Sequence, residues 1–123
     1  VDRWSMGGYI LPEDHVGART ACVHLRRQVD AALEGHDALV LPTLPIPSPP
    51  IGVETLTIAG SEQPVRALML RCTQLFNLTG HPALSMPCGT TSQGLPCGLQ
   101  LVGRRFETDA LIRVALTVEA QLR

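Results

Sequence analysis

Apolar residues recur at helical spacing in three segments of the chain. In the first segment, residues 13–33, they return every three or four positions, at Ala18, Cys22, Leu25, Val29 and Ala32 or Leu33. This period predicts an amphipathic helix with one buried face. The same spacing predicts a second helix, which Pro64 opens and which runs to about Phe76, and a last helix over residues 108–122.

Short apolar runs between these segments predict strands. Residues 38–41 show no polar alternation, so we expect a strand buried on both faces, as in a mostly parallel sheet. Residues 53–58 alternate and suit an exposed strand or hairpin arm. Further strands are predicted over residues 83–86, which Pro87 ends, and over residues 97–102. This order of elements predicts an α/β fold in which helices flank the segments of one sheet.

Two connecting segments are rich in turn-forming residues. Residues 42–50 contain five prolines, which exclude a helix and a central strand. This segment is either a rigid loop after a buried strand or a polyproline ligand for an SH3 or WW domain, and Leu44 and Ile46 favour the loop. We expect a turn over residues 77–82 and an irregular entry segment over residues 1–12.

The composition fits one globular domain and excludes several functions. The 123 residues are 45% hydrophobic and 17% charged, with a net charge of −1, which argues against disorder and against nucleic acid as the main partner. All ten basic residues are Arg, so no Lys is present for a Schiff base, a general base or a phosphate loop. No apolar run approaches the roughly 20 residues that span a bilayer. With no signal peptide visible, we expect a cytoplasmic protein without a membrane partner.

The metal-ligating residue types are too dispersed to predict a metal site. The four cysteines are Cys22, Cys72, Cys88 and Cys97, and no two of them form a CxxC pair. His15 and His24 point to opposite faces of their predicted helix. Cys88 and Cys97 face one another across a predicted hairpin, so a disulfide is geometrically conceivable, but buried free thiols that act as small hydrophobes are favoured.

The sequence lacks the usual catalytic motifs, such as GxSxG, HExxH, GxGxxG and GxxxxGK[ST]. Cys88 lies at a strand end, a common place for a nucleophile, yet no His–Asp pair accompanies it. Ser85 lies inside an apolar strand without flanking glycines to expose it. The strands that end at Leu41 and Met86 are each followed by a loop with Pro or Gly, and ligands bind outside strand ends in open α/β sheets. Thr43 is therefore a candidate pocket hydroxyl.

Three blocks of the sequence strongly resemble the C-terminal end of amidase signature family enzymes. They are DALVLPTLPIPSPPIG at 37–52, FNLTGHPALSMPCG at 76–89 and GLPCGLQLVGRRFETDALIRVALTVEAQL at 94–122. The segment at 12–39 looks like the helix that precedes these blocks in that family. The blocks follow the family's order with fitting gaps, and the resemblance covers about residues 9–122.

The resemblance implies an enzyme that hydrolyses the carbon–nitrogen bond of amides without a metal or an organic cofactor. In this family a Ser nucleophile, a second Ser in a cis peptide and a Lys act together, and a Gly-Ser-rich stretch forms the oxyanion hole. This sequence has neither a Lys nor such a stretch, so no catalytic residue is carried over. We therefore expect residues 1–123 to be a C-terminal fragment of one amidase domain, a mixed sheet flanked by helices, that is inactive alone.

The resemblance also suggests residues that bind a small-molecule amide: Thr43, Pro45, Leu70 and Asn77. Thr43 and Pro45 match the family's Pro-Thr-x-Pro loop near the active-site cleft, and Asn77 matches its Asn-x-x-Gly-x-Pro turn. In the A subunit of the glutamine amidotransferase, an Asp three residues before the Thr of a Thr-x-x-x-Asn pattern holds the ammonium group of glutamine. Leu70 occupies that position here, which favours a general amidase with a less polar substrate.

Two other functions stay open at this point. One is a fragment of the A subunit of a glutamine amidotransferase. The other is a truncated, non-catalytic module that binds a partner through residues 42–50 or through an uncovered sheet edge. Because the sequence begins with Val1 rather than Met, we expect further sequence upstream, which favours an enzyme over a module. Self-association into a homo-oligomer is also left open.

Overall fold

The sheet at the centre of the fold is antiparallel, with strands in the order β1-β5-β4. The structure, a computed structural model, describes residues 5 and 7–122. The strands are β1 Leu39–Pro42, β2 Thr55–Ile58, β3 Ser61–Pro64, β4 Ala83–Thr90 and β5 Pro96–Val102. Strands β2 and β3 form a separate hairpin, which confirms the hairpin arm predicted over residues 53–58.

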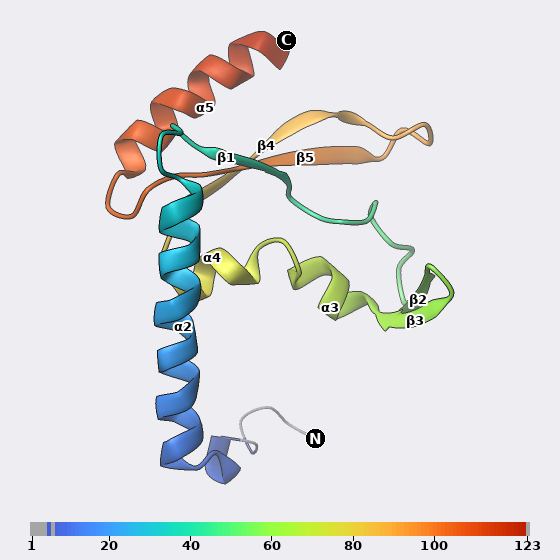
Figure 1. Ribbon diagram of the computed structural model, residues 1–123. Coiled ribbons are helices and arrows are strands. Elements are labelled where there is room, and N and C mark those ends of the chain that lie inside the picture. The colour runs from blue at the N-terminus through green and yellow to red at the C-terminus, as the bar shows by residue number, and fades with distance from the viewer. Residues whose placement is uncertain (1–4, 6, 123) are drawn as a thin grey trace.

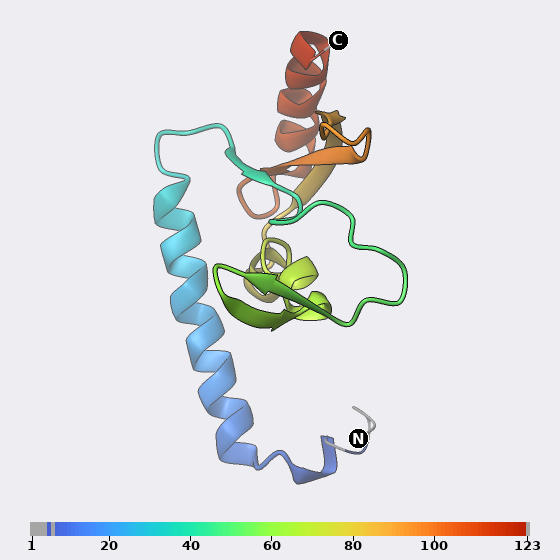
Figure 2. The ribbon, with the colours of Figure 1, turned by 90° about the vertical axis from the view of Figure 1, so that its right-hand side faces the viewer.

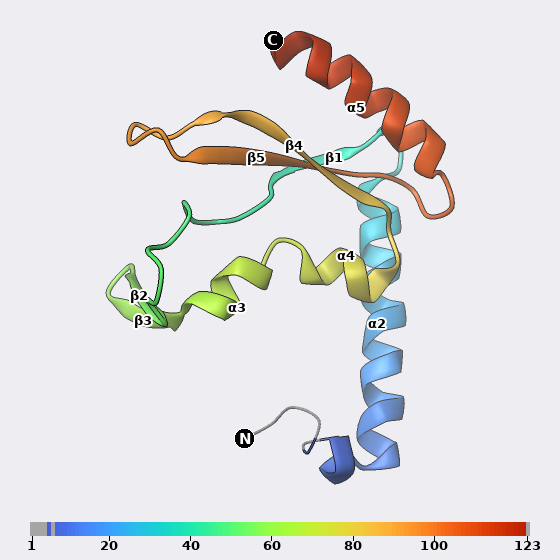
Figure 3. The same cartoon turned by 180° about the vertical axis from the view of Figure 1, so that it is seen from behind.

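Helices lie on both sides of the central sheet. They are η1 Gly7–Tyr9, α2 Pro12–Ala32, α3 Val65–Leu70, α4 Gln74–Thr79 and α5 Thr108–Leu122. Helix α5 lies on one side, and α3 and α4 lie on the other (Figure 1, and from behind in Figure 3). The C-terminal end of helix α2 lies near the sheet, and the rest of the helix projects away from the sheet (Figure 2). None of the described helices is long and apolar enough to cross a membrane. The predicted α/β class is confirmed.

Two apolar clusters hold α2, α4 and α5 against the two faces of the sheet. The first cluster joins α2, α4 and β5 through Val29, Leu33, Phe76 and Val102. The second joins α5 to β4 and β5 through Met86, Leu101, Leu111 and Ala115. Leu101 and Val102 are adjacent in sequence but serve opposite clusters, because successive side chains of a strand alternate between its two faces. The sheet is thus the element shared by both clusters.

The helix predicted over residues 13–33 is confirmed as α2, although only its C-terminal part is packed. Leu33 is 1% exposed, whereas Ala18 is exposed to solvent. The predicted last helix is confirmed as α5, with the same bounds. Of the predicted entry segment, residues 1–4 and 6 lie outside the described residues.

Strand β1 differs from its predicted pairing and burial. It runs antiparallel to β5, with Leu39 opposite Val102 and Pro42 opposite Leu99. Val40 is 60% exposed, so the burial of β1 alternates along the strand. The prediction of a parallel strand buried on both faces was wrong because β1 lies at an edge of this antiparallel sheet, and such sheets can leave one face open.

The second predicted helix is broken at residues 71–73, so that α3 and α4 are separate. The N–H of Thr73 donates to the carbonyl of Leu70 at 3.2 Å, a tighter turn than an α-helix makes. The carbonyl of Cys72 accepts a hydrogen bond from the Gln100 side chain of β5 at 2.9 Å. A partner from a distant strand thus replaces a helical hydrogen bond, and the apolar period does not reveal such a partner.

Two predicted boundaries were also wrong. Asn77 was expected in a turn but lies in α4. The chain turns at Gly80, which has a φ of 76° and donates its N–H to the carbonyl of Phe76 at 2.8 Å. Strand β4 continues past Pro87, with an irregular pairing between Pro87 and Gly89. Because β4 is an edge strand of this sheet, the missing N–H of Pro87 need not interrupt the ladder.

Candidate functional site

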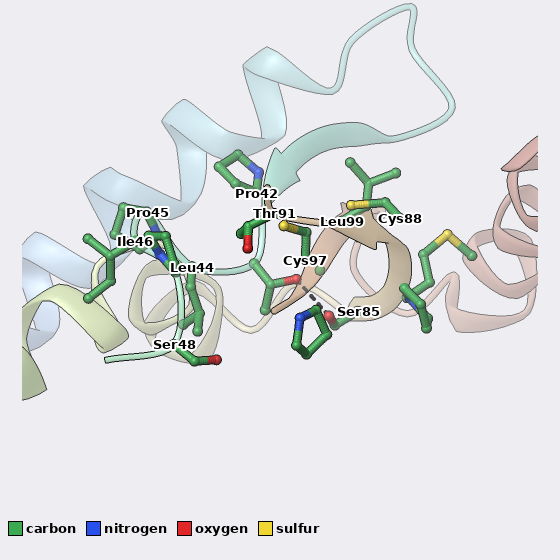
Figure 4. A pocket seen from close by; sticks show the side chains of 16 residues that line it. Pro42, Leu44, Pro45, Ile46, Ser48, Ser85, Cys88, Thr91, Cys97 and Leu99 are labelled. Atoms are coloured by element: carbon green, nitrogen blue, oxygen red, sulfur yellow. Dashed lines mark hydrogen bonds between the residues drawn. The ribbon is translucent and has the colours of Figure 1, made fainter. Parts of the chain in front are cut away.

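A cavity of about 740 Å³ opens where β1 ends and β5 begins. Both β1 and β4 run antiparallel to β5, so their C-terminal parts lie at the same end of the sheet. The loop after β1, the middle of β4 and the first half of β5 form the wall (Figure 4). The cavity lies beyond the end of β1, but at the start of the antiparallel β5, and the ligand site expected beyond strand ends stays a prediction. The volume lies within the roughly 300–1,000 Å³ that is typical of small-molecule sites.

The structure brings two of the four predicted substrate-binding residues to this cavity. Thr43, which is half-buried, and Pro45, which is exposed, both line it. Leu70 lies half-buried at the end of α3, and Asn77 lies exposed on α4. Neither Leu70 nor Asn77 belongs to the cavity lining, and the substrate-binding role of all four residues stays a prediction.

A pair of hydroxyl groups lies in the cavity wall. Thr43 Oγ1 and Ser85 Oγ are 2.6 Å apart, and the dashed line in Figure 4 marks this hydrogen bond. The backbone N–H of Thr43 also donates to the carbonyl of Gly98 at 2.8 Å. One of the two hydroxyl hydrogens suffices for the bond within the pair. The second hydroxyl hydrogen and the remaining lone pairs can therefore serve a neutral polar group of a ligand.

Gly98 makes room for this pair. A Cβ atom at position 98 would lie 2.8 Å from Thr43 Oγ1 and 3.1 Å from Ser85 Oγ, both too close without displacement. Ser85 has no flanking glycine in its own strand, and for that reason it was not expected to be exposed. Gly98, which leaves room for the Ser85 hydroxyl, lies on the neighbouring strand β5, so only the pairing of β4 with β5 brings the two residues together.

The cavity wall is largely apolar and carries no formal charge. Its apolar side chains come from Leu44, Ile46, Met86, Leu99 and several prolines. Among the described residues that line it, none is Asp, Glu, Arg or His. The wall therefore offers shape, apolar contact and hydroxyl groups, but no general acid, general base or counter-ion.

Cys88 and Cys97 both line the cavity as free thiols. The predicted burial of these thiols was wrong, since Cys88 is exposed and Cys97 is only half-buried. Among the described residues, no group of three or more His, Cys, Asp and Glu side chains could hold a metal ion.

His81 lies outside the cavity lining and links α2 to the turn after α4. Its side chain is 0% exposed. Nε2 lies 3.1 Å from Asp30 Oδ1, and Nδ1 lies 2.8 Å from Thr79 Oγ1. Both ring nitrogens are therefore occupied by partners within the fold, so the role of His81 here is structural.

Comparison with known proteins adds the family context of this site. The sequence matches the Amidase family model over residues 12–112. The A subunit of glutamyl-tRNA(Gln) amidotransferase from Myxococcus xanthus is 37% identical over 98 residues, which are 79% of this chain and 19% of that protein. Fatty acid amide hydrolase of Oryza sativa subsp. indica is 36% identical over 112 residues, which are 91% of this chain and 18% of that protein.

The fold is similar to that of a solved amidase. That crystal structure matches with a TM-score of 0.88 at 32% sequence identity, over 96% of this chain and 27% of the amidase chain. The present chain spans about a fifth of the length of the curated relatives it matches.

Proposed function

The chain belongs to the amidase family, and we propose that it is part of an enzyme that hydrolyses the carbon–nitrogen bond of a small amide. The family match over residues 12–112 carries this proposal, because it includes the loop and both strands that line the cavity. The chain contributes the C-terminal part of one amidase domain in this proposal.

The proposal assigns the bond-breaking chemistry to residues outside this sequence. The family resemblance implies a Ser nucleophile, a second Ser and a Lys, and this chain contains no Lys. The cavity wall likewise carries no charged side chain among its described residues. The 123 residues therefore supply one wall of the substrate site, and alone they hydrolyse no amide.

Thr43 and Pro45 contact the substrate in this proposal. The hydroxyl pair of Thr43 and Ser85 supports it, since one hydroxyl hydrogen stays free to bond a carbonyl oxygen, which suits an uncharged amide. Leu70 and Asn77 do not line the cavity. Any contact of theirs with the substrate would need a surface that the rest of the enzyme completes.

A second candidate is the A subunit of a glutamine amidotransferase, which the 37% identity to the Myxococcus xanthus protein favours. Leu70 counts against it, because an apolar side chain cannot pair with the ammonium group of glutamine. The non-catalytic module has less support, since residues 42–48 of the proline-rich segment line the cavity.

A segment exchange tests the proposed function. The segment of the solved amidase that matches this chain is replaced by it, and ammonia release from uncharged aliphatic and aryl amides is measured. We expect the exchange enzyme to hydrolyse these amides and the isolated 123-residue chain to hydrolyse none. An exchange protein that unfolds cooperatively yet hydrolyses no amide would overturn the proposal, as would turnover by the isolated chain.

The same exchange enzyme separates the two candidate functions. A preference for glutamine over an uncharged amide of similar length would favour the amidotransferase. A cytoplasmic location is a further prediction, which cell fractionation would test. Analytical ultracentrifugation of the native protein would show whether it self-associates, which the sequence leaves open.

A further inference from the structure

Two cysteines stand opposite each other on neighbouring strands of the central sheet. Cys88 belongs to β4 and Cys97 to β5, and both are free thiols. We propose that this pair is a site of reversible oxidation, at which a small-molecule disulfide such as oxidised glutathione converts the two thiols to an intramolecular disulfide. This property of the hairpin does not depend on the function proposed above.

The register of β4 and β5 places the two cysteines in opposed positions. Pro87 pairs with Gly98, and the next step of the same register sets Cys88 opposite Cys97. The register then shifts, so that Gly89, which has a φ of 126°, also pairs with Cys97. Two residues of β4 therefore face one residue of β5, which is the arrangement of a β-bulge.

The two thiols also share one face of the sheet. Met86, two residues before Cys88, pairs with Leu99, two residues after Cys97, and both pack in the cluster against α5. Side chains two residues apart lie on the same face of a strand. Opposed residues of an antiparallel pair have Cα atoms about 4.5–5.5 Å apart, which lies within the roughly 4.4–6.8 Å that a disulfide spans. The pair can therefore close with little movement of the backbone.

An oxidant can reach this pair from one side. Cys88 is exposed and Cys97 is half-buried, and both line the cavity (Figure 4). Cys88 is therefore the thiol that reacts first. An accessible thiol beside a second, resolving thiol is typical of cysteines that respond to oxidation, because the second thiol displaces the first adduct.

Oxidation takes place in two steps of thiol–disulfide exchange. In the first step, the thiolate of Cys88 attacks one sulfur of the small-molecule disulfide, whose S–S bond breaks and releases one thiol. In the second step, the thiolate of Cys97 attacks Cys88 Sγ in the mixed disulfide and releases the second thiol. The two cysteines are oxidised, the small molecule is reduced to two thiols, and the two cysteine protons pass to these products. An excess of a reducing dithiol reverses both steps.

Mapping of the modified thiols tests the proposal without any substitution. The 123-residue chain is incubated with oxidised glutathione, the remaining thiols are alkylated, and mass spectrometry of proteolytic peptides identifies the alkylated cysteines. We expect Cys22 and Cys72, which lie outside the sheet, to be alkylated, and Cys88 and Cys97 to be joined to each other. Dithiothreitol should make both available to alkylation again. Oxidation that yields only glutathione adducts or intermolecular disulfides would overturn the inference.

The same reaction in concentrated urea shows whether the fold brings the thiols together. We expect the disulfide between Cys88 and Cys97 to form at least about tenfold faster in native buffer than in urea, because the strand pairing holds the two thiols in position. Equal rates in both solutions would count against the inference.

Two variants test the order of the steps. Cys97→Ser should stop at the mixed disulfide, so that Cys88 keeps one glutathione. Cys88→Ser should react with oxidised glutathione at least about tenfold more slowly, because the remaining thiol of the pair is half-buried. The double variant Cys22→Ser with Cys72→Ser is the matched control, and it should form the disulfide as fast as the unsubstituted chain. A control variant that forms no disulfide would contradict the assignment to Cys88 and Cys97.

The exchange enzyme tests the same pair in the presence of the rest of an amidase. We expect Cys88 and Cys97 to form the same disulfide there, and an enzyme in which oxidised glutathione leaves both thiols unmodified would overturn the inference. Neither result bears on the proposed function, which amide hydrolysis by the reduced enzyme tests separately.

Discussion

Thr43 Oγ1 lies 2.6 Å from Ser85 Oγ, across a strand that contributes only a glycine at the point where the two hydroxyls meet. Thr43 follows β1, Ser85 belongs to β4, and Gly98 belongs to the central strand β5. Side chains two residues apart lie on the same face of a strand, so the strand register determines which residues meet here. The side chains that meet in the cavity wall therefore depend on how all three strands pair.

Substitution of Gly98 should destabilise the chain. In Gly98→Ala the new methyl group would lie 2.8 Å from Thr43 Oγ1, so the hydroxyl pair must move. We expect the free energy of unfolding to fall by about 1–3 kcal/mol, the usual effect of overpacking. Urea denaturation of the 123-residue chain measures this difference.

Gly17→Ala is the matched control for this substitution. Gly17 lies in α2 with nothing within 4 Å of an added Cβ, so Ala should raise the free energy of unfolding by up to about 1 kcal/mol through helix propensity. If Gly98→Ala were as stable as the unsubstituted chain, the two hydroxyl groups near Gly98 would not require a glycine there.

A double-mutant cycle measures the hydroxyl pair itself. Thr43→Val and Ser85→Ala remove the two hydroxyl groups singly and together. We expect a coupling energy of about 0.5–1.5 kcal/mol, the net contribution of a neutral hydrogen bond. The control cycle pairs Thr43→Val with Thr117→Val on the exposed surface of α5, where the effects should add within about 0.5 kcal/mol. A coupling energy near zero for Thr43 and Ser85 would contradict the observed geometry.

The elements that were predicted well are those that local periodicity determines. Helices α2 and α5 begin and end within a residue of the predicted bounds, because their apolar spacing persists over several turns. The break between α3 and α4 was missed because the residue that bonds to the carbonyl of Cys72 there, Gln100, comes from a distant strand. The continuation of β4 past Pro87 was missed for a related reason, since only the strand order shows that β4 lies at an edge.

The lining of the cavity was likewise predictable only where neighbouring residues in the sequence determine it. Thr43 directly follows a predicted strand, so the strand end suggested it as well as the family resemblance. Pro45 was suggested by the family resemblance alone. Ser85 and Gly98 are brought together by strand pairing, which single-sequence patterns do not specify. Leu70 and Asn77 were also suggested by the family resemblance, but they lie outside the cavity lining of the described residues.

Gln100 should be required for the broken helix. Its side chain is 3% exposed and donates to the carbonyl of Cys72 at 2.9 Å. Gln100→Leu keeps a side chain of similar volume but leaves the carbonyl of Cys72 without this donor. We therefore expect the free energy of unfolding to fall by about 1–3 kcal/mol. Urea denaturation measures the loss, and Gln121→Leu on the exposed end of α5 is the matched control, with an expected change within about 0.5 kcal/mol. If both variants change stability equally, Gln100 does not fix the break.

His81 should stabilise the junction between α2 and the turn after α4. Its buried ring bonds Thr79 Oγ1 at 2.8 Å and Asp30 Oδ1 at 3.1 Å. His81→Leu leaves the hydroxyl of Thr79, which is 0% exposed, without its ring partner. We expect the free energy of unfolding to fall by about 1–3 kcal/mol, because a buried hydroxyl then stays unpaired. Asp30→Asn should have a smaller effect, since the Asp30 side chain is 50% exposed and the amide oxygen can still accept.

Rescue by a second substitution separates this account of His81 from simple loss of packing. Thr79→Val removes the orphaned hydroxyl, so the double variant His81→Leu with Thr79→Val should regain about 1 kcal/mol relative to His81→Leu alone. His24→Leu is the matched control, because His24 is exposed on α2 and its loss should change stability by less than about 0.5 kcal/mol. A double variant that is less stable than His81→Leu would show that the hydroxyl–imidazole bond is not what His81 contributes.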